Sequence, residues 1–390
     1  MRVGIYGGSF NPPHTGHVKA AATAAKQLAL NLLVVIPVGV PPHKTMPEGS
    51  PAADLRLQMA QNSFGNMPNT IVLDIEAKNP EPSYTSETIL AIKGMYPGAQ
   101  LILLLGTDMY LSLETWKDHE ALLNTITPAV FSRDAGDISE ITVQSKYLKE
   151  KYDVKTEIIH NDAVEISSSE LRKSLPLRGG IGYIKDTNYS YIISGRLYGA
   201  KPDWNWLREK AYAMLNPKRV PHVAACEAAA IKLAERWGVN PDDAREAAVL
   251  HDITKKFDLK AHIKALEDNG EKISAAITPN EEKLLHAKSG AVLAGALFGA
   301  SEQVVDAIRW HTTGRTNMTM LAKVLYLADY IESTRNFEGV EKLRDLAYEN
   351  IDEAMILGLE MTVSDVQSRG IVPDRATLDA INYLKGSYLD

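Results

Sequence analysis

The spacing of hydrophobic and polar positions changes near residue 199. Up to that point, short apolar runs bounded by turn residues alternate with longer amphipathic stretches. The stretches predict helices, and we expect a parallel sheet covered on both faces, with ligands bound at the carboxyl ends of its strands. The apolar runs predict these strands at residues 3–6, 32–37, 70–75, 101–105, 129–131 and 156–159.

The strand pattern ends after Pro202. Beyond it, apolar residues recur at three- and four-residue spacing as far as Leu389, which predicts one helix after another. The helical pattern is broken at Asn216-Pro217, Asn240-Pro241 and Thr278-Pro279. A chain of 390 residues also exceeds what one hydrophobic core usually supports. We therefore expect an α/β domain at residues 1–198 and an all-α bundle at residues 199–390.

Composition narrows the classes of partner. The chain has 42 basic and 49 acidic residues, a net charge of -7, which argues against a broad nucleic-acid surface but leaves small anionic ligands open. The single cysteine, Cys226, cannot form an internal disulfide, and its alanine-rich surroundings predict a buried helix position. No charged and apolar leader opens the sequence, and the longest apolar stretches, at 31–40 and 289–300, are short for a membrane span. We expect a cytoplasmic protein without nucleic-acid or membrane partners, and a homo-oligomer stays open.

The first predicted strand runs directly into Gly7 and Gly8. Without side chains there, backbone N–H groups can approach a phosphate, and a helix that begins near Thr15 points its positive end at the same place. His14 and His17 lie three residues apart at this helix start, so both imidazoles can donate hydrogen bonds to phosphoryl oxygens. A tight turn followed by a solvated helix cap is the plainer alternative. It leaves the coincidence of strand, glycines and paired histidines unexplained.

Residues 7–17, Gly-Gly-Ser-Phe-Asn-Pro-Pro-His-Thr-Gly-His, resemble the signature of nucleotidyltransferases that join a nucleotide to a phosphate ester. Further segments are similar, in order and spacing, to bacterial nicotinate-nucleotide adenylyltransferases: residues 83–88, 105–108, 116 and 166–172. The resemblance covers almost all of residues 1–198 and implies a Rossmann-like sheet. It also implies transfer of AMP from ATP to nicotinate mononucleotide, which gives nicotinate adenine dinucleotide and pyrophosphate in NAD biosynthesis.

The implied reaction sets the roles of the site residues. A phosphate needs no base to activate it at neutral pH, so the protein mainly has to align the reactants and neutralise developing charge. We expect the developing negative charge to be neutralised by His14, His17, Lys44 and Arg172, with Mg²⁺ bound to the triphosphate. The residues expected to contact the nucleotides are Gly7, Gly8, Ser9, Phe10, Thr85, Gly106, Asp108, Trp116, Ser167, Ser168 and Ser169. Among these, Thr85 and Trp116 would hold the pyridine ring.

Several of these assignments have plainer alternatives. Trp116 could be a core residue, Lys44 a solvated loop lysine, and Ser167 to Ser169 simple helix caps, although capping is compatible with phosphate binding. Arg133 is followed by Asp-Ala-Gly where the family more often has a proline-glycine turn, which leaves the details of that loop open. The acceptor could also be nicotinamide mononucleotide or phosphopantetheine, because the His-x-Gly-His unit is shared widely. Thr85 together with Trp116 favours a pyridine ring.

The second half contains residues of the types that bind metals. Adjacent His251 and Asp252 cannot point the same way along a helix, so joint use of both requires ligands from other helices, as in bundle cores. Imidazole and carboxylate groups suit Fe, Mn or Zn, with Fe preferred. Six such groups are too many for one metal ion that keeps a free coordination position, but they suit two metal ions. A histidine on an apolar helix face is more often a core residue, but that alternative would have to hold at every position. The set is His222, His251, Asp252, His286, His311 and Asp329.

This order of ligand types resembles the HD superfamily of metal-dependent phosphohydrolases. Residues 250–255, 286–291, 310–315 and 328–332 look like those of bacterial HD-domain enzymes that cut diadenosine tetraphosphate into two ADP, and the match spans about residues 204–375. The resemblance implies attack by a water shared between two metals. It assigns one metal to His222, His251, Asp252 and Asp329, and the other to Asp252, His286 and His311.

Basic residues follow three of these segments. Lys255, Arg315 and Arg335 could hold the remaining phosphates, with Lys255 acting beside Asp252 in catalysis, or they could be ordinary surface charges. The helical half could also act on another nucleotide, such as a deoxynucleotide or a cyclic dinucleotide. A regulatory nucleotide-binding module without turnover is a further alternative, against which the complete ligand set argues.

Overall fold

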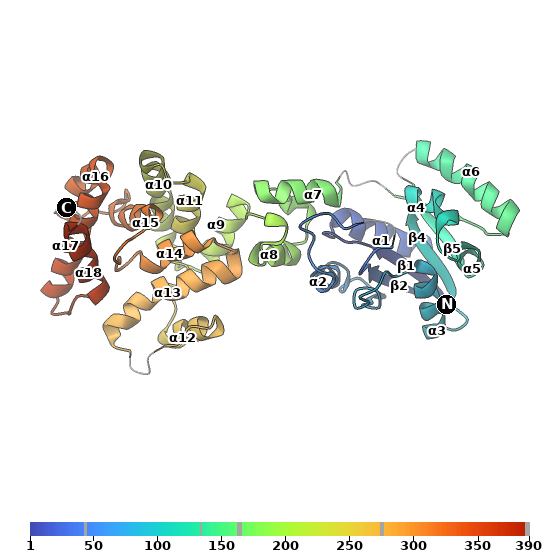
Figure 1. Ribbon diagram of the computed structural model, residues 1–390, viewed down its shortest axis with the longest axis horizontal. Helices are drawn as coiled ribbons and strands as arrows, with labels where there is room; N and C mark the ends of the chain where they lie inside the picture. Colours follow the sequence, from blue (N-terminus) through green and yellow to red (C-terminus); the bar gives the residue numbers. More distant parts are fainter. Residues whose placement is uncertain (43–44, 133–134, 162–165, 274–276, 387–390) are drawn as a thin grey trace. The chain divides into compact units, whose positions relative to one another are not determined.

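The computed structural model describes residues 1–42, 45–132, 135–161, 166–273 and 277–386. These residues form two compact units, Met1–Lys201 and Pro202–Asp390, and the division falls close to the boundary expected between residues 198 and 199. The first unit contains a parallel sheet with helices and the second is helical, so the predicted fold class is confirmed (Figure 1). Among the described residues, no helix combines the length and apolar character that crossing a membrane requires.

The sheet of the first unit changes direction of winding at β1. Its described strands run parallel in the order β3-β2-β1-β4-β5-β6, so the chain builds outward from β1 on one side and then, from β4, on the other. The switch point therefore lies between β1 and β4, where open α/β sheets bind ligands. The strands are β1 (Arg2–Gly8), β2 (Leu32–Pro37), β3 (Thr70–Val72), β4 (Gln100–Gly106), β5 (Ile126–Ser132) and β6 (Glu157–His160).

Each face of the sheet is buried under helices, because alternate residues of a strand point to opposite faces. Leu33 and Val35 of β2 pack in one core cluster with residues of α1 and α2, while Val34 and Ile36 pack in the other with residues of α3 and α6. The helices of this unit are α1 (Thr15–Gln27), α2 (Ala53–Phe64), α3 (Thr85–Met95), α4 (Thr107–Leu111), α5 (His119–Leu123), α6 (Ala135–Tyr152), α7 (Ser168–Ser174) and α8 (Asp186–Ser194).

Strands β1 and β4 stop pairing with each other before either strand ends. β1 stays paired to β2 as far as Gly8, opposite Pro37, but its pairing with β4 ends at Ile5, opposite Leu103. The carboxyl ends of β1 and β4 therefore separate at the switch point. This leaves Gly7 and Gly8 with a free edge on the β4 side.

Three helical segments of the second unit begin at the prolines where the sequence predicted a break in the helical pattern. Asn240 and Thr278 cap the helices that begin at Pro241 and Pro279, and Asn216 caps a short 3-10 helix that begins at Pro217. Proline suits a first helical position because an N–H group there would have no partner within the helix, so nothing is lost when proline lacks one. The helices are α9 (Trp204–Ala213), α10 (Val220–Trp237), α11 (Pro241–Leu250), α12 (Leu259–Asp268), α13 (Pro279–Phe298), α14 (Glu302–Trp310), α15 (Met320–Ile331), α16 (Val340–Glu349), α17 (Ile351–Ser368) and α18 (Arg375–Gly386).

Candidate active sites

A cavity of about 600 Å³ lies at the switch point of the sheet. Gly7, Gly8 and Ser9 from the end of β1 line it, and Gly106 from the end of β4 lines it too. A side chain at Gly7 would meet nothing within 4 Å, so there is open space for a ligand beside its backbone. The cavity has the size of a small-molecule site.

His14 and His17 stand together at the start of α1, as predicted. The backbone N–H of His14 donates to Nδ1 of His17 at 3.2 Å, and the two ring centroids are 3.7 Å apart. Because Nδ1 of His17 accepts this hydrogen bond, its proton must lie on Nε2 when the ring is neutral. Burial lowers the pKa of His14 to about 4, and burial together with the charge of His14 lowers the pKa of His17 to about 3. Both rings are therefore neutral donors at pH 7 rather than cations.

The segment that opens α7 docks on the loop that precedes α1. Ser168 Oγ donates to the carbonyl oxygen of Pro12 at 2.9 Å, and Nη1 of Arg172 donates to that of Asn11 at 2.6 Å. Nη2 of Arg172 donates to Ser169 Oγ at 3.0 Å, which holds the guanidinium over the start of the helix. Ser167 caps α7, since its Oγ accepts from the N–H of Glu170 at 3.1 Å. Residues about 160 positions apart thus meet beside the histidine pair.

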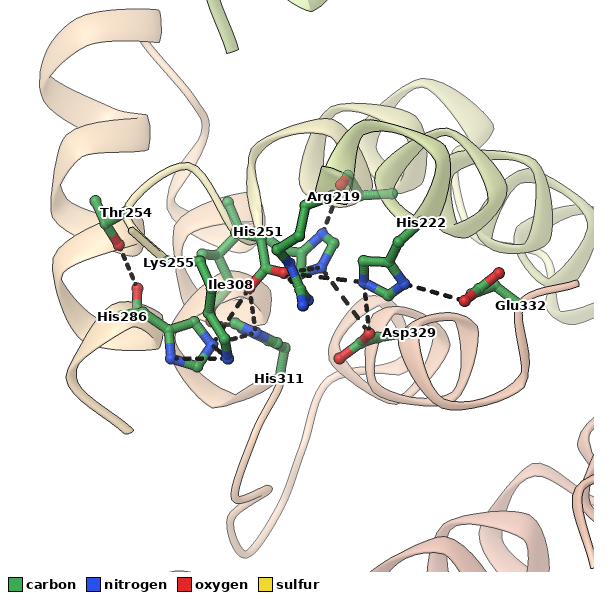
Figure 2. Close-up of polar contacts among 12 residues, drawn as sticks. Arg219, His222, His251, Thr254, Lys255, His286, Ile308, His311, Asp329 and Glu332 are labelled. Atoms are coloured by element: carbon green, nitrogen blue, oxygen red, sulfur yellow. Dashed lines mark hydrogen bonds and ion pairs between the residues drawn. The ribbon is translucent and has the colours of Figure 1, made fainter. Parts of the chain in front are cut away.

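In the second unit, six predicted ligand residues converge. His222 lies in the first turn of α10, His251 and Asp252 directly follow α11, His286 lies on α13, His311 follows α14 and Asp329 is near the end of α15. Figure 2 shows the four imidazoles turned toward one another. Potential ligand atoms lie within 4.8 Å of one another in three groups: His222, His251 and Asp252; His251, His311 and Asp329; Asp252, His286 and His311.

The two carboxylate oxygens of Asp252 face different partners. Oδ2 lies 3.4 Å from Nε2 of His251 and 3.8 Å from Nε2 of His222. Oδ1 lies 3.4 Å from Nε2 of His286 and 3.8 Å from Nε2 of His311. Ligands bound to one metal at about 2.1 Å lie roughly this far apart, so Asp252 is placed to bridge two metal ions.

Each imidazole in the cluster has its Nδ1 engaged elsewhere. Nδ1 lies 2.7 Å from a backbone carbonyl oxygen three residues earlier in His251, His286 and His311. In His222 it lies 3.0 Å from a carboxylate oxygen of Glu332. These contacts favour the proton on Nδ1 and leave Nε2 as the nitrogen whose lone pair can face a metal, which is how proteins orient histidine ligands.

The carboxylate of Asp252 is buried, and only one of its two oxygens is paired among the described residues. Asp252 is 1% exposed; its Oδ2 forms an ion pair with Arg219, while its Oδ1 has no hydrogen-bond partner among the described residues. Burial opposes its ionisation, but the charge and hydrogen bond of His251 and the charge of Lys255 hold the pKa of Asp252 well below its usual value. A buried oxygen of an ionised carboxylate is costly to leave without a partner unless a cation lies beside it. The donor set therefore fits a pair of divalent metal ions.

Comparison with known proteins agrees with this geometry. Residues 5–174 match the cytidylyltransferase-like family, and residues 219–334 match the HD domain family. A probable nicotinate-nucleotide adenylyltransferase from Carboxydothermus hydrogenoformans is 34% identical over 199 residues, which cover 50% of this chain and 98% of that protein. The first half of the chain belongs to the nicotinate-nucleotide adenylyltransferase family.

The second half carries an HD domain. The symmetrical bis(5'-nucleosyl)-tetraphosphatase of Bacillus subtilis is 39% identical over 161 residues, which cover 40% of this chain and 86% of that protein. A solved structure described as a predicted HD superfamily hydrolase involved in NAD metabolism, from Clostridium acetobutylicum, has 31% identity and a TM-score of 0.46. It covers 48% of this chain and all of that one.

Not every residue predicted for the adenylyltransferase site lines the cavity. Thr85 and Trp116 do, and Trp116 also packs against the core, so both interpretations of this tryptophan have support. Phe10 is 1% exposed and packs edge-on beneath His17, with ring centroids 5.4 Å apart. Asp108 is exposed on α4 and is not among the described residues that line the cavity. Lys44 lies outside the described residues, as does Arg133.

The basic residues of the HD domain divide into two groups. Lys255 Nζ lies 2.8 Å from Nε2 of His286, and Arg335 Nη2 lies 2.7 Å from a carboxylate oxygen of Asp329. Arg315 instead pairs with Asp306 at 3.1 Å, so its predicted role at the phosphates stays a prediction.

Three functional candidates were missed in the sequence. Arg219 forms an ion pair with Asp252. Glu332 is 1% exposed and holds His222. Arg56 is 2% exposed, and its guanidinium donates to the carbonyl oxygens of Ser9, Val38 and Gly39. Glu332 had a signal in the sequence, because it lies within residues 328–332, a segment that resembles the HD-domain enzymes.

Proposed function

We propose that the first unit transfers AMP from ATP to nicotinate mononucleotide. The observation that carries the proposal is the arrangement of three phosphate-binding elements: the glycines of β1 line the cavity, the histidine pair follows them at the start of α1, and the segment from Ser167 to Arg172 docks on the loop between the two. The function named for the relatives supports the choice of acceptor. Trp116 and Thr85, which line the same cavity, would hold the pyridine ring.

In the proposed reaction, a phosphate oxygen of nicotinate mononucleotide attacks the α-phosphorus of ATP, and pyrophosphate leaves. His17 donates from Nε2 to a phosphoryl oxygen, since its Nδ1 is occupied. The N–H groups at the start of α1 and the guanidinium of Arg172 hold the negative charge that develops. Mg²⁺ bound with ATP would neutralise further charge on the triphosphate.

A product assay with ATP and nicotinate mononucleotide tests this function on the full chain. We expect nicotinate adenine dinucleotide and pyrophosphate in equal amounts, and His17→Ala should lower the rate about 100-fold or more because one donor to the transition state is lost. His160→Ala is the matched control, since His160 is an exposed residue of the same unit. An unchanged rate in His17→Ala would refute the assignment, and parallel assays with nicotinamide mononucleotide and phosphopantetheine test the alternative acceptors.

We also propose that the second unit hydrolyses diadenosine tetraphosphate to two ADP at a pair of metal ions. The carrying observation is Asp252, whose two oxygens face separate histidine pairs and whose buried Oδ1 has no hydrogen-bond partner among the residues described. The function named for the Bacillus subtilis relative supports the substrate. His222, His251, Asp252 and Asp329 would hold one ion, and Asp252, His286 and His311 the other.

The surrounding residues have distinct parts in this reaction. When bound, the metal ions would activate a water and withdraw charge from the attacked phosphoryl group. Lys255, Arg219 and Arg335 lie against the ligand residues and would hold the phosphate oxygens of the substrate. Glu332 keeps the imidazole of His222 oriented toward the cluster.

Metal analysis combined with product chromatography tests the second function. We expect about two ions of Fe, Mn or Zn per chain and ADP as the product of diadenosine tetraphosphate. Asp252→Ala should remove both the metal and the hydrolysis, whereas Asp268→Ala, an exposed position on α12, should change neither. Hydrolysis that survives Asp252→Ala would exclude the metal mechanism. Deoxynucleotides and cyclic dinucleotides assayed in parallel test the other substrate classes, and tight binding without turnover would favour a regulatory module.

A further inference from the structure

A second cavity lies beside the metal-ligand cluster. It has a volume of about 450 Å³ and is lined by Lys255, Phe257, His262, Glu282, Lys283 and His286. This volume is within the range of small-molecule sites. Because His286 belongs both to this cavity and to the cluster, a ligand here would reach the cluster directly.

Buried hydroxyl groups connect the wall of this cavity to the cluster. Nδ1 of His262, on α12, lies 2.8 Å from Ser289 Oγ, on α13. Ser289 Oγ donates to Thr254 Oγ1, and Thr254 Oγ1 donates to the carbonyl oxygen of His286, each at 2.9 Å. His262 is 3% exposed, and Thr254 and Ser289 are 0% exposed. The position of His262 is therefore fixed relative to a metal-ligand residue, as a built site requires.

The lining combines a charged part with an aromatic part. Lys255 Nζ, 2.8 Å from Nε2 of His286, places a positive charge where the cavity meets the cluster. The rings of Phe257 and His262 lie together, with centroids 5.8 Å apart. Glu282 adds a carboxylate acceptor, and Nε2 of His262 has no hydrogen-bond partner within the described part of the chain. An anion and a flat ring with polar edges suit these two parts.

We propose that this cavity binds the base of an adenine nucleoside diphosphate whose phosphates lie at the metal-ligand cluster. The proposal rests on the proposed function of the second unit and adds the place of the nucleoside. Phe257 stacks on the base, and Glu282 accepts a hydrogen bond from its exocyclic amine. Lys255 holds the phosphate end.

Photolabelling of the Mn²⁺-loaded full chain with 8-azidoadenosine 5'-diphosphate tests the proposal without turnover. We expect the label in peptides that span residues 255–262, competed away by ADP. Phe257→Leu keeps an apolar side chain but removes the planar ring, so the yield in these peptides should fall about ten-fold. Phe257→Trp should retain the yield because it keeps a ring for stacking. Phe337→Leu, on an aromatic residue packed against Tyr330, is the matched control.

The result has an internal reference, because peptides from residues 1–201 also carry label if the first unit binds ADP. Metal content, measured for each variant, shows whether the second unit remains folded. Label outside the cavity, or an equal yield in Phe257→Leu, would overturn the proposal, as would equal losses in Phe257→Leu and Phe257→Trp with metal retained. Since ADP is only bound, failure to cleave diadenosine tetraphosphate would count against the proposed function and leave the base site standing.

Discussion

The imidazole of His17 is held in one tautomer by the backbone of its own helix start. The N–H of His14 occupies Nδ1 of His17, so only Nε2 can carry the proton of the neutral ring. The low pKa of both histidines follows from burial. A fixed neutral donor suits a site that must accept a polyanion without binding a proton first.

Histidine ¹⁵N NMR checks this arrangement in the nucleotide-free protein. We expect His17, assigned with the His17→Gln variant, to show a protonated Nε2 and an unprotonated Nδ1 at pH 7, and to remain neutral down to about pH 4, since its pKa is about 3. Unfolding frees the ring to titrate near 6.5, so each of the two histidines should lower the unfolding free energy as the pH falls below that value, by at most about 1.4 kcal/mol per pH unit. A titration midpoint near 6.5 in the folded protein would contradict the assignment.

Arg56 illustrates a buried charge whose hydrogen bonds, among the described residues, go to backbone carbonyl groups. Its guanidinium links the loop after β1, at Ser9, to the loop after β2, at Val38 and Gly39. Both loops line the nucleotide cavity, so the arginine fixes one wall of the site relative to another. Its pKa is lowered by burial.

Replacement of Arg56 by Met should destabilise the first unit by about 3 kcal/mol, because buried carbonyl oxygens lose their donors. Hydrogen exchange followed by mass spectrometry locates the effect, and the amides of the loop after β1 should exchange faster in the variant. Lys93→Met, at an exposed position on α3, should change little. Equal exchange in the Arg56→Met variant and the parent protein would show that the loop is held by other contacts.

At the scale of elements, the spacing of hydrophobic residues and the positions of helix-breaking residues predicted most of the fold. Buried strands appear as continuous apolar runs, and the three Asn-Pro and Thr-Pro breaks proved to be the capped starts of helical segments. β3 is shorter than expected, ending at Val72 rather than Ile75. It lies at the edge of the described sheet and pairs with β2. Just beyond it, Asp74 forms an ion pair with Lys78, four residues later in the chain.

The predictable part of the sites is the part that depends on residue type. Six residues of the two metal-binding types His and Asp, at positions expected in the core of the bundle, predicted a cluster, because each buried polar side chain would otherwise need its own hydrogen-bond partner. Arg56 and Arg219 could not be predicted in this way, since a lone arginine in an amphipathic helix or turn looks like a surface charge until its partners are known. Arg315 shows the reverse case, a basic residue near a ligand segment that pairs with Asp306 instead.

Glu332 makes the end of α15 a support for the start of α10. It accepts from Thr334 Oγ1 at 2.6 Å and lies 3.0 Å from Nδ1 of His222, so it links the two helices behind the cluster. Glu332→Gln should weaken metal binding about 10-fold to 100-fold while the chain stays folded. Competition with a metal chelator measures the change, and Glu235→Gln, at an exposed site on α10, is the control. Unaltered metal affinity would mean that Glu332 has only a structural role.

On the scale of the whole molecule, each of the two proposed reactions would use residues of one unit. The described residues that line the nucleotide cavity belong to Met1–Lys201, and those of the metal-ligand cluster belong to Pro202–Asp390. We therefore expect His17→Ala to leave hydrolysis intact and Asp252→Ala to leave adenylyl transfer intact. The link between the two activities is then chemical, through the compounds they make and consume.

One such link follows from the proposed reactions. If the γ-phosphate of a second ATP takes the place of the mononucleotide phosphate, its attack on the α-phosphorus yields diadenosine tetraphosphate and pyrophosphate, which balances two ATP. The second unit would then remove this by-product as two ADP.

At millimolar ATP without nicotinate mononucleotide, Asp252→Ala should accumulate diadenosine tetraphosphate, while the parent chain should release ADP and pyrophosphate. The double variant with His17→Ala should form neither by-product nor ADP, and chromatography of the nucleotides distinguishes the three cases. Absence of the tetraphosphate from the Asp252→Ala reaction would separate the two activities and leave their fusion without a chemical reason.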